Sequence, residues 1–192
     1  MTHAQESPCD AMSGNDPLLG EIALRCEEAF LKWNPSPGRR IVNVGGAECI
    51  SIRIEKLFPQ CTIVHVDAEA GLSDVPAGLT NLHVLSSDLR TANFLPESAS
   101  AIIIVHALSA MPDAAGAIRT MAGWLEPGGH IFVCDIGRRT SLLDWIVTRK
   151  RKRFHGIAEF RRLFESAMLT VEESFVFNRG WSHVALCCKP LR

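Results

Sequence analysis

The sequence predicts an α/β protein built on a seven-stranded, mostly parallel sheet with helices on both faces and an antiparallel hairpin at the C-terminus. Short runs rich in Val and Ile alternate with segments of helical periodicity from about residue 40 to residue 136. Such continuous apolar runs are typical of parallel strands, because both faces of the sheet are buried. Two strand-like segments then follow each other at the end of the chain without a helix between them, which indicates a hairpin.

Apolar residues at helical spacing predict a first helix over residues 17–33, and Pro and Gly interrupt it over 34–38. The strands are expected at Ile41–Val44, Thr62–Val66, Leu82–Ser86, Ala101–His106, His130–Asp135, Thr170–Phe177 and His183–Lys189. Further helices are expected at Cys49–Phe58, Ala114–Leu125, Ser141–Lys152 and Ile157–Met168.

The 192 residues are enough for one domain with a substantial core, which we place at 17–192 behind a flexible polar tail at 1–16. We see no apolar run long enough for a membrane span and no secretory signal, so we expect a cytoplasmic protein. The seven cysteines are an odd number without CxxC spacing, and they are expected to be reduced, mostly buried thiols. No histidine pair has metal-ligand spacing, so no metal site is predicted.

Positive charge is concentrated in one segment. Residues 138–162 contain nine Lys or Arg and two acidic residues, which gives +7 and leaves −8 for the rest of a chain of net charge −1. Three interpretations remain open for this stretch: a solvated helix end, contact with a small anionic substrate, or contact with nucleic acid or a protein. Few aromatic residues accompany the basic run, so nucleic acid is the least favoured of these partners.

Two features predict a cofactor pocket. A buried strand, Ile41–Val44, leads into the glycine turn Gly45-Gly46, and the next strand ends in the carboxylate of Asp67. In parallel α/β sheets, ligands bind beyond the carboxyl ends of the strands, where a glycine turn lets backbone approach the ligand. The alternatives are an ordinary tight turn at Gly45-Gly46 and a helix-capping or surface role for Asp67.

Several stretches occur in an order that one family shares. They are Asn43–Cys49, Asp67, Ser87-Asp88-Leu89, Leu95–Ile102, His106–Asp113 and Trp124–His130. With these motifs the chain resembles the class I S-adenosylmethionine-dependent methyltransferases over about residues 20–190. The resemblance implies a Rossmann-like fold, S-adenosylmethionine as the cofactor, and transfer of its methyl group to a small acceptor, which the basic segment at 138–156 suggests is anionic. In this family that segment often covers the substrate.

The resemblance also implies roles for individual residues. The cofactor-binding residues would be Asn43, Gly45, Gly46, Asp67, Ala68, Asp88, Leu89 and His106. Asp67 would bind the ribose hydroxyls and Asp88 the adenine amino group. His106 is also the candidate general base, with loop ordering as its alternative role. The substrate residues would be Met111, Asp135, Arg138 and Arg139.

The glycine loop departs from the family pattern. Asn43 stands where the family carries an acidic residue, and Ala47 and Cys49 replace two later glycines. These replacements leave a second hypothesis open, a non-catalytic binding or scaffold protein that keeps the methyltransferase fold. A nicotinamide-dependent oxidoreductase is disfavoured, because the third glycine of that fingerprint is absent.

Overall fold

The computed structural model describes residues 17–45, 48–67, 78–87, 89, 91–136, 156–177 and 182–191. Seven strands form one sheet in the order β3-β2-β1-β4-β5-β7-β6. The strands are β1 (Arg40–Val44), β2 (Thr62–Asp67), β3 (Leu82–Ser86), β4 (Ala99–Val105), β5 (Leu125–Ile136), β6 (Thr170–Phe177) and β7 (Ser182–Cys188). The helices are α2 (Pro17–Trp33), α3 (Glu48–Leu57), α4 (Ala114–Trp124) and α6 (Ile157–Glu165), with a 3-10 turn η1 (Leu108–Ala110).

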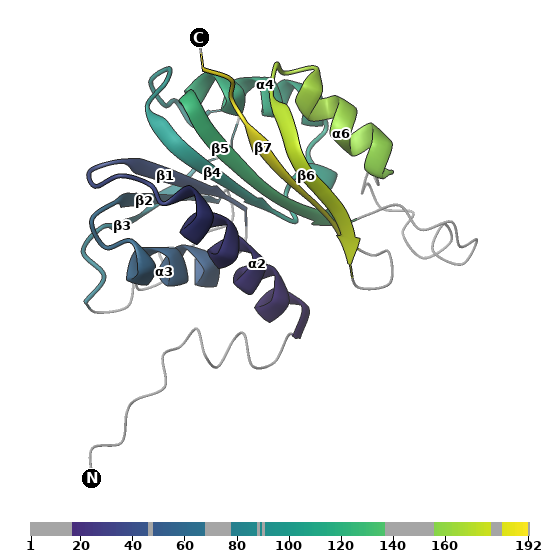
Figure 1. Cartoon of the computed structure of the whole chain (residues 1–192). Helices are drawn as coiled ribbons and strands as arrows, with labels where there is room; N and C mark the ends of the chain where they lie inside the picture. The colour runs from purple at the N-terminus through teal and green to yellow at the C-terminus, as the bar shows by residue number, and fades with distance from the viewer. Residues whose placement is uncertain are drawn as a thin grey trace.

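The helices form a layer on each face of the sheet. Figure 1 shows α2 and α3 together on one face and α4 and α6 on the other. Side chains alternate along each strand, so β4 sends Ala101, Ile103 and Val105 into the core beneath α2 and α3. Its residues Ile102 and Ile104 enter the second core, beneath α4 and α6. Burial on both faces explains why this strand is a nearly continuous Ile run.

The fold class expected from the sequence is confirmed. Strands β1 to β5 are parallel, and β7 runs antiparallel to both β5 and β6, so the C-terminal hairpin closes one end of the sheet. The strand β5 starts at Leu125 rather than at His130, because Leu125 already pairs with Ala99 of β4 and because Gly128 and Gly129 bond to the backbone of Lys189. The expected helix at 141–152 and the tail at 1–16 lie outside the described residues.

Five of the six cysteines in the described part of the chain are buried, and none of these six forms a disulfide there. Burial raises the pKa of the Cys26, Cys134 and Cys187 thiols, with smaller contributions from neighbouring acids and thiols. These side chains are therefore protonated, packing thiols at neutral pH. Among the helices of the described segments, none combines the length and apolar character needed to cross a bilayer.

Candidate functional site

A cavity of about 770 Å³ lies at the carboxyl ends of β1, β2 and β4, beside the first turns of α4. This is the edge of the sheet at which the sequence predicts a cofactor pocket. Its size is within the range of about 300–1,000 Å³ that is common for small-molecule sites. The lining residues are Val44, Gly45, Val66, Asp67, Ser87, Leu89, His106, Ala107, Ala110, Met111, Pro112, Asp113, Gly116, Ala117 and Thr120.

Gly45 forms the turn at the end of β1 and requires the absence of a side chain. Its φ angle is +103°, a region that L side chains rarely adopt. A Cβ atom at this position would lie 2.9 Å from both the Ala107 Cβ and the Val105 carbonyl oxygen. The Gly45 N–H donates to the Val66 carbonyl at 3.0 Å, which fixes the turn against β2. The first glycine of the loop therefore brings bare backbone to the cavity wall.

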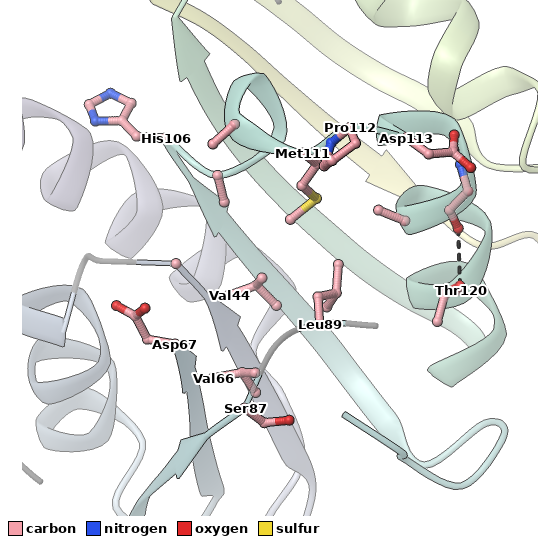
Figure 2. A pocket seen from close by; sticks show the side chains of 15 residues that line it. Val44, Val66, Asp67, Ser87, Leu89, His106, Met111, Pro112, Asp113 and Thr120 are labelled. Carbon is pink, nitrogen blue, oxygen red and sulfur yellow. Dashed lines mark hydrogen bonds between the residues drawn. The ribbon is translucent and has the colours of Figure 1, made fainter. Parts of the chain in front are cut away.

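The polar side of the cavity is formed by the ends of β2 and β3. Asp67 is the last residue of β2 and lines the cavity, where it is partly exposed. Ser87 follows β3 and also lines the cavity, and its hydroxyl bonds with that of Thr91 at 3.0 Å. Leu89 contributes an apolar wall. Figure 2 shows Asp67 on the same side of the cavity as Val44 and Val66, with Met111 and Leu89 across from it.

His106 follows β4 with a positive φ angle of 53°, which is uncommon for a residue other than glycine. Its N–H donates to the Cys134 carbonyl at 2.9 Å, so the backbone stays tied to β5 as the chain turns. His106 lines the cavity, and Figure 2 shows its ring directed away from Met111 and Leu89. Backbone of this kind costs about 1–3 kcal/mol and is found most often at functional sites and turns.

The wall opposite Asp67 consists of η1, the loop after it and the start of α4. Asp113 caps α4 by accepting a hydrogen bond from the Gly116 N–H at 2.8 Å. Gly116, Ala117 and Thr120 then line the cavity from one face of the helix, and they leave it open because Gly116 has no side chain and the other two side chains are small. Met111 is the largest apolar group on this wall and is partly buried.

Asn43 is placed away from this cavity. Its side chain is fully buried, and its Nδ2 donates to the Ser51 Oγ at 2.7 Å and lies 3.2 Å from the His65 Nδ1. Ser51 lies on α3 and His65 on β2, so the amide joins three elements inside the core. Burial lowers the pKa of His65, an effect opposed by Asp67 and Glu48, so its imidazole is neutral at pH 7.

Asp135 also lies below the cavity rather than in its wall. The side chain is only 2% exposed, and its Oδ2 accepts a hydrogen bond from the Ser109 N–H at 3.0 Å. Ser109 belongs to η1, the turn that leads to Met111. The carboxylate thus holds the turn that shapes the cavity.

Cys49, which replaces a family glycine, is 5% exposed and packs in the core with α2 residues such as Cys26 and Phe30. It is not among the lining residues, so its side chain does not fill the cavity.

The structure therefore brings Gly45, Asp67, Leu89, His106 and Met111 to one cavity, and it places Asn43 and Asp135 behind its walls. The remaining site residues expected from the sequence, Gly46, Ala68, Asp88, Arg138 and Arg139, lie outside the described residues, as does Ala47.

Sequence reasoning missed the contribution of α4. The signal was present, because Gly116, Ala117 and Thr120 are small residues at positions that share one helix face, directly after the loop at 106–113.

Comparison with known proteins gives a matching family. Residues 44–133 match the model of the methyltransferase domain family. No curated protein sequence matches the chain. Several solved structures share the fold at low identity. The [4+2]-cyclase SpnF superposes with a TM-score of 0.75 at 13% identity, over 88% of this chain and 81% of that one.

Two further structures are methyltransferases. An S-adenosylmethionine-dependent methyltransferase from Mesorhizobium loti has a TM-score of 0.64 at 17% identity, over 80% of this chain and 93% of that one. The second is the geranyl diphosphate C-methyltransferase from Streptomyces coelicolor, in complex with Mg²⁺, geranyl-S-thiolodiphosphate and S-adenosylhomocysteine. Its TM-score is 0.67 at 10% identity, over 80% of this chain and 70% of that one. The resemblance to the class I S-adenosylmethionine-dependent methyltransferases that the sequence predicts is thus confirmed, by a family model over residues 44–133 and by the fold.

Proposed function

We propose that this protein is an enzyme that binds S-adenosylmethionine and transfers its methyl group to a small acceptor. The observation that carries the proposal is the meeting of the Gly45 turn and the Asp67 carboxylate in one cavity at the carboxyl ends of the strands. A family match supports the cofactor, because S-adenosylmethionine is the methyl donor of class I methyltransferases.

The residues present fit this cofactor. Gly45 has no side chain, so a ligand in the cavity can approach its backbone closely. A Cβ atom at this position would crowd Ala107 and Val105. Asp67 offers a carboxylate acceptor where two ribose hydroxyls need a common partner. Apolar walls from Val66, Leu89 and Met111 suit the flat faces of an adenine ring.

The bound cofactor would supply an electrophilic methyl group on a sulfonium. The contribution of the protein is then to position the reactants and to exclude water. Asp67 and the Gly45 turn fix the donor end, while Met111 and the small side chains of α4 leave room beside it for an acceptor. Such alignment can remove about 7–11 kcal/mol from the barrier of a reaction between two bound groups.

We assign His106 to removal of a proton from the acceptor. It lines the cavity directly after β4, and because its ring is directed away from Met111, this role requires the side chain to rotate toward the acceptor. An imidazole suits proton transfer near neutral pH.

We further infer that the acceptor is anionic, because residues 138–162 carry a charge of +7. The solved Streptomyces coelicolor enzyme, which has the same fold, contains a thiolodiphosphate, and this precedent supports the inference. Arg138 and Arg139 are the residues we assign to the acceptor. A cytoplasmic location remains a prediction from the sequence.

The test is isothermal titration with S-adenosylmethionine and S-adenosylhomocysteine on the wild type and on Asp67→Asn. We expect both ligands to bind the wild type. The variant should bind at least about 10-fold more weakly, because a charged acceptor is replaced by a neutral group at a hydrogen bond worth about 1.5–3 kcal/mol. Glu165→Gln on α6 is the matched control, since Glu165 is exposed and pairs with Arg161 away from the cavity. Absence of binding at millimolar ligand would overturn the proposal.

A second candidate is a protein of this fold that does not transfer methyl groups. It is favoured by the placement of Asn43, which stands at the acidic position of the family loop yet is fully buried, with its Nδ2 donating to Ser51 of α3. The similarity in fold to a protein named as a [4+2]-cyclase also supports it. Binding of S-adenosylhomocysteine without methyl transfer to any acceptor in a broad screen would favour this candidate.

A further inference from the structure

Three side chains with different donor atoms meet at the end of the sheet that lies opposite the cavity, near the start of β5 and the end of β7. His130 lies on β5, Glu172 on β6 and Cys188 at the end of β7. His130 and Cys188 are direct partners in the antiparallel β5–β7 pair. An imidazole nitrogen, the Cys188 sulfur and a Glu172 carboxylate oxygen all lie within 4.8 Å of one another. None of the three lines the cavity.

A β-bulge brings the acidic side chain to this face. Val171 pairs with Cys187 and Glu173 pairs with Leu186, so Glu172 is an extra residue between two register positions. Val171 points into the core under α4 and α6, whereas Glu172 reaches His130, and Glu173 reaches Lys32 of α2 at 2.9 Å. Two consecutive acidic residues thus face the α2 side, an arrangement that a regular strand does not permit.

The surroundings hold the imidazole and leave the carboxylate available. The Trp33 ring stacks on His130 with ring centroids 4.6 Å apart and an angle of 19° between the planes, which restricts the imidazole. Lys32 pairs with Glu173, while Glu172 makes no hydrogen bond or ion pair with any other residue in the described part of the chain. The Cys188 sulfur has a weak contact of 3.4 Å with the Lys189 carbonyl.

We propose that His130, Glu172 and Cys188 bind a Zn²⁺ ion at this end of the sheet. Nitrogen, carboxylate oxygen and thiolate sulfur are the three donor types of protein zinc sites, and a tetrahedral ion places its ligands about 3.3–3.8 Å apart. A spacing below 4.8 Å closes to this range by rotation of the exposed Glu172 side chain and the Cys188 thiol. Water completes the coordination. The ion links three strands beside the end of α2, so it stabilises the hairpin against β5.

The experiment uses the full chain, stripped with a chelator and kept reduced, and Co²⁺ as a spectroscopic probe that Zn²⁺ then displaces. We expect one Co²⁺ per chain, with a thiolate-to-metal charge-transfer band, tetrahedral visible bands, and a rise in Tm with Zn²⁺. Cys188→Ser should abolish the charge-transfer band. Glu172→Gln should weaken binding at least about 100-fold, since even outer-shell partners are worth 10–100-fold.

Glu173→Gln is the matched control, because it removes the neighbouring carboxylate of the same bulge and should leave metal affinity unchanged. Glu172 is at the surface, so Glu172→Gln tests the site even if His130→Gln fails to fold after losing its contact with Trp33. No stoichiometric binding, binding unaffected by Cys188→Ser and Glu172→Gln, or equal losses in Glu173→Gln would each overturn the proposal. None of these measurements depends on methyl transfer.

Discussion

Asn43 and Ser51 are joined by a hydrogen bond of 2.7 Å between the side-chain amide and the hydroxyl, inside the core beneath the Gly45 turn. His65 completes the cluster, with its Nδ1 3.2 Å from both partners. The network joins β1, α3 and β2 at the point where the chain turns from strand to helix. An amide suits this place because it donates to two acceptors without carrying a charge.

Restoring the acidic residue of the family should therefore destabilise this protein. In Asn43→Asp a buried carboxylate loses the donor groups that Ser51 and His65 use. We expect the free energy of unfolding at pH 7.5 to fall by about 1–3 kcal/mol, the usual cost of an unsatisfied buried group. Urea unfolding measures this change, with Asn34→Asp at an exposed position as the control. Unchanged stability together with tighter binding of S-adenosylmethionine would show that residue 43 serves the cofactor instead.

The stability of the fold should decrease on mild acidification. Burial lowers the pKa of His65 from its ordinary value of 6.5, so the unfolded chain binds more protons than the native chain below that pH. The free energy of unfolding then falls as the pH falls from about 6.5, with a slope of at most about 1.4 kcal/mol per pH unit from this residue. Denaturant unfolding between pH 8 and pH 5 measures the effect.

His65→Gln should flatten this dependence, because glutamine does not titrate and its amide oxygen still accepts from Asn43. Part of the dependence should remain, since burial also lowers the pKa of His130. The same pH profile in the variant and the wild type would rule out a contribution from His65.

Gly45→Ala should lower the free energy of unfolding by more than the ordinary cost of a positive φ angle in an L residue. That cost is about 1–2 kcal/mol for an L residue. At Gly45 the added Cβ also meets the Ala107 Cβ and the Val105 carbonyl oxygen at 2.9 Å. Gly38→Ala is a matched control, because Gly38 has a φ angle of +77° with open space around it.

We expect Gly45→Ala to lose more stability than Gly38→Ala and to bind S-adenosylmethionine more weakly, as measured by urea unfolding and calorimetry. Equal losses in the two variants would mean that Ala107 and Val105 move aside without cost.

Cys49→Gly tests whether a lost family glycine limits the cofactor. Cys49 is buried in the first turn of α3, in the core that α3 shares with α2, so its removal leaves a small void and adds a glycine to a helix. The glycine alone costs about 1 kcal/mol. We expect lower thermal stability and unchanged affinity for S-adenosylhomocysteine in parallel thermal-shift and calorimetric titrations. Tighter binding would show that the Cys49 side chain reaches the ligand.

The order of strands and helices could be predicted from the sequence because burial on both faces of a sheet produces a simple pattern. In β4 every residue from Ala101 to Val105 is buried, and the strand appears as an apolar run. The positions of Gly45 and Asp67 followed from the same logic, since each ends a strand at the edge where ligands bind.

The directions of polar side chains could not be predicted in this way. Asn43 and Gly45 are two residues apart, yet the amide enters the core under α3 while the glycine lines the cavity. Only the register with His65 on β2 and the position of Ser51 on α3 decide this, and neither contact follows from the pattern of β1 itself. The proposed zinc ligands His130, Glu172 and Cys188 are also far apart in the sequence, so no local pattern predicts that they meet. A bulge, which leaves no periodic signal in the sequence, places Glu172 beside the other two.

The role of His106 can be separated from that of its backbone by two substitutions, His106→Asn and His106→Ala. The φ angle of 53° is tolerated by asparagine but costs alanine about 1–2 kcal/mol, so only His106→Ala should be markedly less stable in urea. If the imidazole removes the proton from the acceptor, both variants should lose about 10²–10⁴-fold in kcat while calorimetry shows unchanged binding of S-adenosylmethionine. Full turnover in His106→Asn, with loss only in His106→Ala, would assign His106 to shaping the loop that joins β4 to η1.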